Sequence, residues 1–135
     1  MAERVRYHFG LHDFGNAGEV FSFKGPKGKK GLLRDYGVYG PTETFTAVTT
    51  AATIAVGVSG NADAHGEELS IGTLADTAGG ISARTEATDP DNLRTTYIVE
   101  PDLPADTSIF VTCIAPTGGT PAGIAVPFVD VEWQD

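Results

Sequence analysis

The sequence predicts an all-β protein that folds as a single-domain β-sandwich, similar to a jelly roll in its number of strands. Two observations carry this prediction. The chain has 17 glycines and 8 prolines in 135 residues, which is too many for long helices. Its apolar residues alternate with polar ones over short stretches that are separated by turn residues. At this length we expect one domain, with an N-terminal arm or first strand at 1–19 and the sandwich at 20–135.

The first element is an alternating run near the N-terminus. Val5, Tyr7 and Phe9 share one face of this run. Arg4 and Arg6 lie on the other face. Such alternation indicates either a strand of the sandwich or an extended arm that reaches another molecule.

Residues 20–39 form the most informative stretch of the chain. Val20–Phe23 and Leu32–Tyr39 predict two strands that are rich in apolar and aromatic residues. Between them, residues 25–31 read Gly-Pro-Lys-Gly-Lys-Lys-Gly, and no side chain of this segment can contribute to a core. We expect the two strands to pair, so that the segment becomes the tip of a basic, glycine-rich hairpin loop.

Several further strands are expected along the rest of the chain. The strongest β signal is at 42–58, where threonine and branched apolar residues are frequent. Residues 59–68 read as an acidic loop, and residues 69–77 fit either a short strand or one helical turn. Shorter strands are expected at 81–86, 94–100 and 108–115.

The last expected strand is 124–133, which we expect to pair with 108–115 in a wide hairpin. Its apolar residues change parity beside Pro127. A β-bulge is the simplest explanation of such a change, because proline is tolerated at bulges and edges.

Charge is distributed unevenly along the chain. Residues 1–35 contain seven of the nine basic residues and four acidic ones, whereas residues 36–135 contain two basic and fourteen acidic residues. The first part therefore carries +3 and the second −12, which together give the net charge of −9. This asymmetry indicates a basic segment that meets an acidic surface, and a body that repels nucleic acid.

Known catalytic and ligand-binding motifs do not fit the chain. The glycines of residues 25–31 lack the spacing and following helix of a phosphate-binding loop, and their flanks do not suit an RNA-binding KH loop. Cys113 alternates with apolar residues, so it reads as a buried thiol. His65 lies among acidic residues whose spacing matches no known calcium loop. No stretch is long and apolar enough to span a membrane.

Two other functions remain open at this point. A carbohydrate-binding sandwich would need exposed aromatic side chains as a stacking platform, for which Tyr36, Tyr39 and Trp133 are candidates. A small hydrolase would need a cleft with paired carboxylates, and a chain this short has little room for one. We therefore expect recognition rather than catalysis, with no enzyme activity and no cofactor.

Four segments together resemble the head decoration proteins of tailed bacteriophages, also called capsid cement proteins. They are FSFKGPKGKKGLLRDYGVYGPTETF, TTAATIAVG, LSIGTLADT and CIAPTGGTPAGIAVPFVDVEWQ. The resemblance covers most of the chain and implies a β-rich protein, often a homotrimer, on the outer surface of the virion. There it would bind the phage major capsid protein and stabilise its contacts, without nucleic acid or membrane as a partner.

The family has no fixed motif for its contact residues, so the expected contacts rest on charge. Two groups are expected to touch the capsid, one in the N-terminal arm and one in the basic loop. They are Arg4, Arg6 and Tyr7 in the arm, and Lys24, Lys27, Lys29, Lys30 and Arg34 in or beside the loop.

Overall fold

The computed structural model describes residues 3–46 and 49–134, and these form ten β-strands and no helix. The strands are β1 (Glu3–His8), β2 (His12–Asp13), β3 (Glu19–Phe23), β4 (Gly31–Thr46), β5 (Thr53–Val58), β6 (Asn61–Ser70), β7 (Gly80–Ser82), β8 (Asp102–Leu103), β9 (Ile109–Ile114) and β10 (Ala122–Trp133). The all-β prediction is confirmed. Accordingly, the described residues contain no helix that is long and apolar enough to cross a bilayer.

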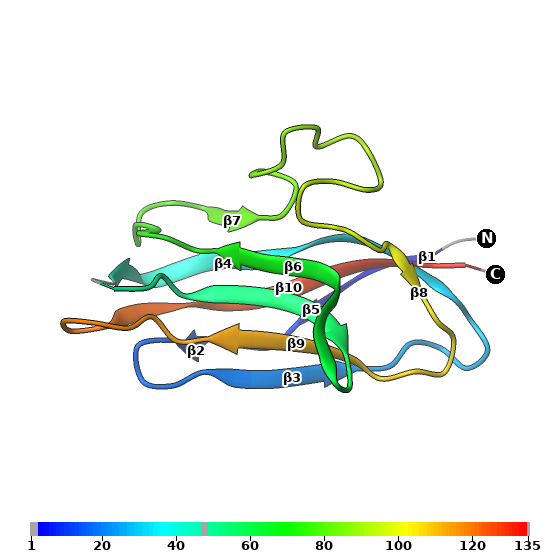
Figure 1. Ribbon diagram of the computed structural model, residues 1–135, viewed down its shortest axis with the longest axis horizontal. Helices are drawn as coiled ribbons and strands as arrows, with labels where there is room; N and C mark the ends of the chain where they lie inside the picture. Colours follow the sequence, from blue (N-terminus) through cyan, green and yellow to red (C-terminus); the bar gives the residue numbers. More distant parts are fainter. Residues whose placement is uncertain (1–2, 47–48, 135) are drawn as a thin grey trace.

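The strands form two antiparallel sheets, which agrees with the predicted sandwich (Figure 1). Sheet A has the order β1-β10-β4-β7, with β2 also paired to β10 and β8 also paired to β4. Sheet B has the order β3-β9-β5-β6. The pairing of β10 with β4 is long, running from Ala122 opposite Thr46 to Trp133 opposite Gly31.

Consecutive strands mostly lie in different sheets. Strand β3 pairs with β9 in sheet B, whereas β4 pairs with β10 in sheet A. The predicted hairpin at 20–39 is therefore wrong, and so is the predicted hairpin between 108–115 and 124–133, because β9 and β10 also lie in different sheets. Alternation reveals where a strand runs, but it does not reveal which strand lies beside it.

The odd-numbered residues of strand β10 face the core along the whole strand. Ala125, Val129, Val131 and Trp133 all belong to the core cluster, whereas Phe128 lies under the Arg6 guanidinium on the other face of sheet A. The predicted parity change at Pro127 is therefore wrong. The irregularities lie in β4, which has more residues than β10 between matched pairs, for example between the pairs Asp130–Asp35 and Val131–Leu33.

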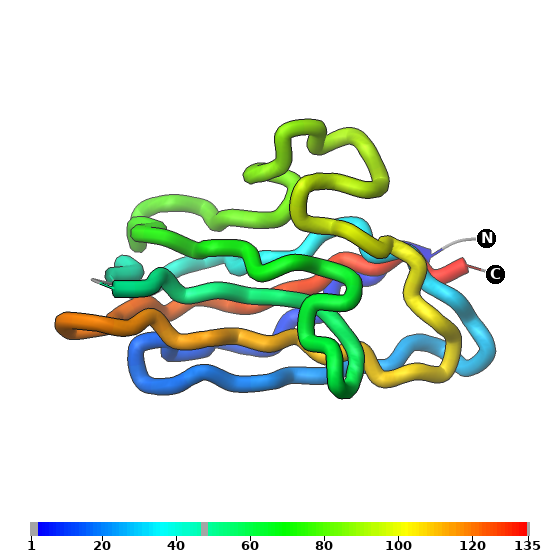
Figure 2. The backbone as a smooth tube through the Cα atoms, in the orientation of Figure 1, coloured from blue at the N-terminus to red at the C-terminus, as the bar shows by residue number. Residues whose placement is uncertain are grey.

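Other segments also differ from their predicted form. Residues 59–68 are mostly strand β6 rather than an acidic loop, and residues 42–58 contain the end of β4 and the whole of β5. The expected strand at 94–100 contributes one isolated bridge, between Ile98 and Gly66. This segment belongs to an irregular excursion between β7 and β8, which projects beyond the sandwich in Figure 2.

The N-terminal run is a strand of sheet A. Strand β1 pairs with β10 from Glu3 opposite Trp133 to His8 opposite Phe128, and β2 continues along the same neighbour. The two ends of the chain consequently lie side by side at one end of the sandwich (Figure 1).

The core lies between the two sheets. Its largest fully buried side chains include Trp133, Tyr36 and Phe14. Cys113 is buried in β9 as predicted, and burial raises the pKa of its thiol to about 12. A buried thiol with so high a pKa is an inert packing residue at neutral pH.

Aromatic rings pack between the two edge strands β1 and β3. The Tyr7 ring stacks on Phe23 with centroids 4.3 Å apart, and Phe9 stacks on Phe21 at 5.1 Å. These contacts join sheet A to sheet B on the side of the sandwich where the loop between β3 and β4 begins.

Candidate functional site

The basic loop, residues 24–30, crosses from sheet B to sheet A at the end of the sandwich where the chain ends lie (Figure 1). It is not a hairpin tip, because the strands it joins lie in different layers. The two ends of this loop are held by different sheets. The position of the loop therefore depends on how the two sheets pack.

The loop is built around the indole ring of Trp133. A Cβ atom added at Gly25 would lie 2.3 Å from ring atoms of Trp133, and one added at Gly31 would lie 2.8 Å from them. Trp133 is 2 % exposed, and its Nε1–H donates a hydrogen bond to the Tyr7 hydroxyl at 2.9 Å. Gly25 in the loop and Gly31 at the start of β4 are therefore needed for close packing on a buried ring rather than for flexibility.

Backbone hydrogen bonds hold the rest of the loop. The Gly28 N–H donates to Asp106 Oδ1 at 2.8 Å, and the Gln134 N–H donates to the Lys30 carbonyl at 2.8 Å. Within the loop, the Lys29 N–H donates to the Pro26 carbonyl at 3.1 Å. Gly28 has φ of +77°, a conformation in which glycine is favoured. The loop thus has a defined backbone that is tied to two other segments.

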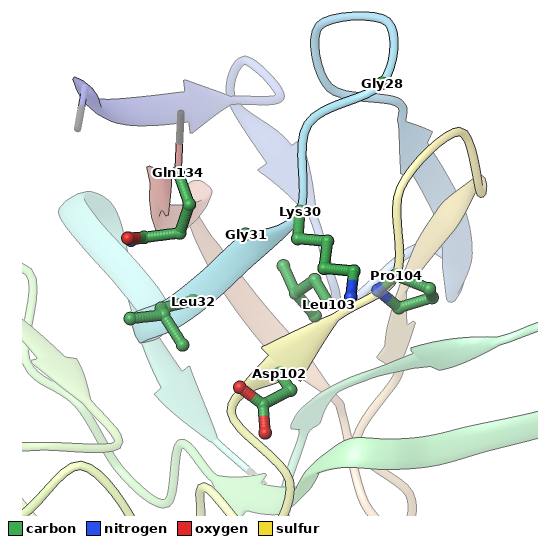
Figure 3. A pocket seen from close by; sticks show the side chains of 8 residues that line it. All are labelled: Gly28, Lys30, Gly31, Leu32, Asp102, Leu103, Pro104 and Gln134. Atoms are coloured by element: carbon green, nitrogen blue, oxygen red, sulfur yellow. The ribbon is translucent and has the colours of Figure 1, made fainter. Parts of the chain in front are cut away.

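The loop lysines lie on this fixed backbone with their side chains largely toward solvent. Lys24, Lys27 and Lys30 are exposed, and Lys29 is half-buried. In Figure 3 the Lys30 side chain extends across a groove toward Pro104. The groove has a volume of about 840 Å³ and lies between the loop, β8 and Gln134. The predicted lysines are therefore gathered at one end of the molecule.

Two arginines of the predicted site, Arg6 and Arg34, form ion pairs within the protein. Arg6 binds Asp130 through two hydrogen bonds of 2.6 and 2.8 Å, and its guanidinium lies 4.1 Å from the centroid of the Phe128 ring. The hydrogen bond to Asp130 raises the pKa of Arg6. Arg34 Nη2 lies 3.0 Å from Glu132 Oε1. Arg4 is exposed and lies opposite Glu132 in the pairing of β1 with β10.

Tyr7 also has an internal role. Its ring stacks on Phe23 and its hydroxyl accepts the hydrogen bond from Trp133. The predicted contact residues thus divide into a basic group around the loop and a group with partners inside the protein. This internal group, Arg6, Tyr7 and Arg34, stabilises the sheet from which the loop projects, although the Arg6 side chain remains 42 % exposed.

The sequence reading missed a charged cluster on the outer face of sheet A. The carboxylate of Asp35 accepts hydrogen bonds from the backbone N–H groups of Tyr36 and Arg84. Burial nevertheless raises the pKa of Asp35. Arg84 donates to the Arg34 carbonyl and, at 2.8 Å, to the Asn92 carbonyl, so it ties the excursion between β7 and β8 to β4. No local pattern relates residues that are about fifty positions apart.

The alternative sites receive little structural support. Tyr36 is fully buried and Trp133 nearly so, which leaves Tyr39 as the partly exposed member of the proposed aromatic platform. Within residues 3–46 and 49–134, no group of three or more His, Cys, Asp and Glu side chains is arranged to hold a metal ion. The acidic residues around His65 lie along strand β6.

Comparison with protein-family models, with curated proteins and with solved structures finds no match to this chain.

Proposed function

We propose that the protein is a structural virion protein that binds the outer surface of a phage capsid and stabilises contacts between major capsid proteins. The observation that carries this proposal is the basic loop. Its exposed lysines, Lys24, Lys27 and Lys30, lie on a fixed backbone at one end of a protein with a net charge of −9. The segment that resembles capsid decoration proteins includes this loop.

A fixed cationic loop suits attachment to an acidic protein surface. A loop that is already ordered loses little conformational entropy on binding, so more of the interaction energy contributes to affinity. Complementary charge also orients the approach, since the acidic body is repelled by the same surface that attracts the lysines. Among the predicted contacts, Arg4 joins the lysines, while the internal group supports them.

The proposed fold within the sandwich class is a jelly roll. Apart from the two-residue strands β2 and β8, each sheet has four strands, in the orders β1-β10-β4-β7 and β3-β9-β5-β6. Among these eight described strands, β5 and β6 form a hairpin, and the other consecutive pairs lie in opposite sheets. Jelly rolls of eight strands in two sheets occur in viral capsid proteins and also in lectins, so this fold agrees with a virion location without selecting it.

A decoration protein benefits from repeated attachment. Copies that each bridge several shell subunits reach durable binding through moderate individual contacts. The resemblance further implies a homotrimer, which would present three basic loops to the shell. The loss of one charge per copy would then weaken every contact in the assembly.

The test is co-sedimentation with decoration-free capsids of the phage that encodes the chain. We expect a Lys27→Gln/Lys30→Gln variant to bind several-fold less than the wild type at low salt. Added salt should weaken the binding of the wild type more steeply than the binding of this variant. A Lys27→Arg/Lys30→Arg variant keeps both charges and should bind like the wild type.

The matched control is Arg94→Gln, which removes an exposed positive charge in the excursion between β7 and β8. Its binding should be unchanged. Equal binding of the wild type and the double glutamine variant throughout a salt titration would contradict the proposal.

A further inference from the structure

The groove beside the basic loop is the roomiest of three hollows on the described surface. Its volume is about 840 Å³, whereas the hollows beside Val20 and Tyr39 have about 380 and 330 Å³. Ligand sites in proteins have volumes of about 300 to 1,000 Å³. The groove lies in the upper part of this range, so it has room for a short, extended peptide segment.

One wall of the groove is apolar. Leu32 of β4 is half-buried, Leu103 of β8 is buried, and Pro104 after β8 is exposed. Apolar surface of this kind is stabilised when an apolar side chain of a ligand covers it, because both surfaces then leave water. A ligand that fits the groove therefore places an apolar side chain against this wall.

The other wall belongs to the basic loop and brings a positive charge to the groove. Gly28 and Lys30 line this wall, and Figure 3 shows the Lys30 side chain crossing toward Pro104. Lys30 is exposed, and Lys27, also exposed, precedes it in the same loop. A carboxylate bound in the groove would thus meet cations on the loop side.

Two acidic side chains near the groove already accept hydrogen bonds within the protein. Asp106 Oδ1 accepts one from a loop N–H at 2.8 Å, and Glu132 Oε2 accepts one from the Gln134 side chain at 2.9 Å. Asp102 also lines the groove, but Figure 3 shows its carboxylate apart from the Lys30 amino group and directed away from it. The loop side of the groove is therefore the side that attracts an anion.

Both walls are held in place before any ligand binds. Strand β8 pairs with the start of β4, and the Leu33 N–H donates to the Pro101 carbonyl at 2.7 Å. On the loop side, the Lys30 carbonyl accepts the Gln134 N–H. A preformed groove loses little conformational entropy on binding.

We propose that this groove binds an extended acidic segment of a protein partner, with an apolar side chain of the segment against Leu103 and Pro104 and a neighbouring carboxylate at Lys30. The inference rests on the proposed attachment to the capsid and deepens it, since it states which kind of segment the basic end holds. Charge selects an acidic segment. The net charge of the protein is −9, so such a segment is repelled by most of the surface and attracted to this end.

The two charges that line the groove also give the segment a direction. Lys30 attracts a carboxylate on the loop side, whereas Asp102 repels one on the side of β8. We therefore expect the acidic residue of the segment to lie toward the loop and its apolar residue toward β8.

The test is a titration of the isotope-labelled protein with the peptide acetyl-Gly-Asp-Leu-Gly-amide at low salt, followed by amide NMR signals. The signals of Gly31, Leu32 and Leu103 should shift and saturate. A peptide with asparagine in place of the aspartate should bind about threefold to fivefold more weakly. A peptide with glycine in place of the leucine should bind about tenfold more weakly.

Variants of the protein test the same contacts. Lys30→Gln should weaken binding of the acidic peptide about threefold to fivefold, and Lys30→Arg should keep it. Arg94→Gln, which changes an exposed charge in the excursion between β7 and β8, should bind the peptide like the wild type.

Equal binding of the three peptides would overturn the proposal, and so would shifts confined to residues outside the groove. A short oligothymidylate is the competing anion. If it shifted the groove signals at lower concentration than the acidic peptide does, the groove would recognise phosphate, and the proposal would also be overturned.

Cross-linking on capsids tests the source of the segment. Photoreactive benzoylphenylalanine in place of Pro104 should cross-link to the major capsid protein, at a segment where aspartate or glutamate lies beside an apolar residue. Attachment to capsids without this cross-link would contradict the groove as the docking place. Peptide binding in the groove without attachment to capsids would contradict the proposed attachment alone, so the two failures are distinguishable.

Discussion

Trp133 links the core to the loop that carries the exposed lysines. Its indole packs edge-on against Phe23, with ring centroids 6.5 Å apart, and it donates a hydrogen bond to Tyr7. Gly25 and Gly31 approach the same ring from the loop side. One side chain therefore joins β10, β1, β3 and the basic loop, and its loss would affect both stability and loop position.

We predict that Trp133→Ala lowers the free energy of unfolding by about 3 to 5 kcal/mol, because it leaves a large cavity in the core. Trp133→Phe keeps a ring but loses the hydrogen bond to Tyr7, so it should cost less, about 1 to 2 kcal/mol. Urea unfolding followed by far-ultraviolet circular dichroism measures both. A cost below about 1 kcal/mol for the alanine variant would contradict a central role for the indole.

Asp35 gives a prediction about pH. Burial raises its pKa above the ordinary value of 3.8, so the folded state holds this proton more tightly than the unfolded chain does. The contribution of Asp35 to stability therefore falls as pH rises from 3.8 through the raised pKa, and it is constant above that value. Asparagine does not titrate, and its oxygen still accepts hydrogen bonds from the Tyr36 and Arg84 N–H groups.

We therefore predict that the stability of Asp35→Asn relative to the wild type increases with pH across this window and then levels off. Unfolding experiments on both proteins at a series of pH values measure the difference. A relative stability that decreases with rising pH would show that the carboxylate is favoured in the folded state, contrary to the effect of its burial.

At the residue scale, the pattern of neighbouring residues predicted burial, whereas contacts between residues far apart in the sequence could not be predicted. The alternation around Cys113 predicted a buried thiol, which the structure confirms. The glycines of the basic loop predicted an open tip, whereas Gly25 and Gly31 are required by a tryptophan about a hundred residues away. Likewise, the positive charges of Arg6 and Arg34 were visible, but their partners Asp130 and Glu132 were not.

At the scale of elements, the basic loop depends on close packing at Gly25. We predict that Gly25→Ala lowers the free energy of unfolding by about 1 to 3 kcal/mol, because the added methyl group would overlap the Trp133 ring. It should also speed hydrogen exchange of the Gly28 N–H. Urea unfolding and amide exchange measured by NMR test these two effects.

The matched control is Gly79→Ala. A Cβ atom at Gly79 would meet nothing within 4 Å, so this variant should unfold like the wild type. If both variants lost the same stability, the loss at Gly25 could not be assigned to contact with the Trp133 ring.

Strand positions could be predicted better than strand partners. Strand β9 and the end of β10 lie where the alternation placed them. Pairing failed because neighbours in sequence were assumed to be neighbours in a sheet, whereas most connections here pass between sheets. Strand β6 was missed because its exposed edge carries Glu67 and Glu68, which resemble a loop in composition.

For the whole molecule, the charge asymmetry of the sequence corresponds to a difference between surfaces. The lysines gather at the end of the sandwich that holds the chain ends, the outer face of sheet A carries paired charges, and the outward residues of β3 and β9 in sheet B carry none. Composition predicted a basic attachment segment, but only the fold reveals where the uncharged surface lies.

Electron cryo-microscopy of the protein bound to the phage capsid that is proposed as its partner tests the central claim most directly. We predict that residues 24–30 face the shell and lie against acidic side chains of the major capsid protein, with the excursion between β7 and β8 directed away from the shell. A reconstruction in which the basic loop points into solvent, while another surface of the protein contacts the capsid, would contradict the account.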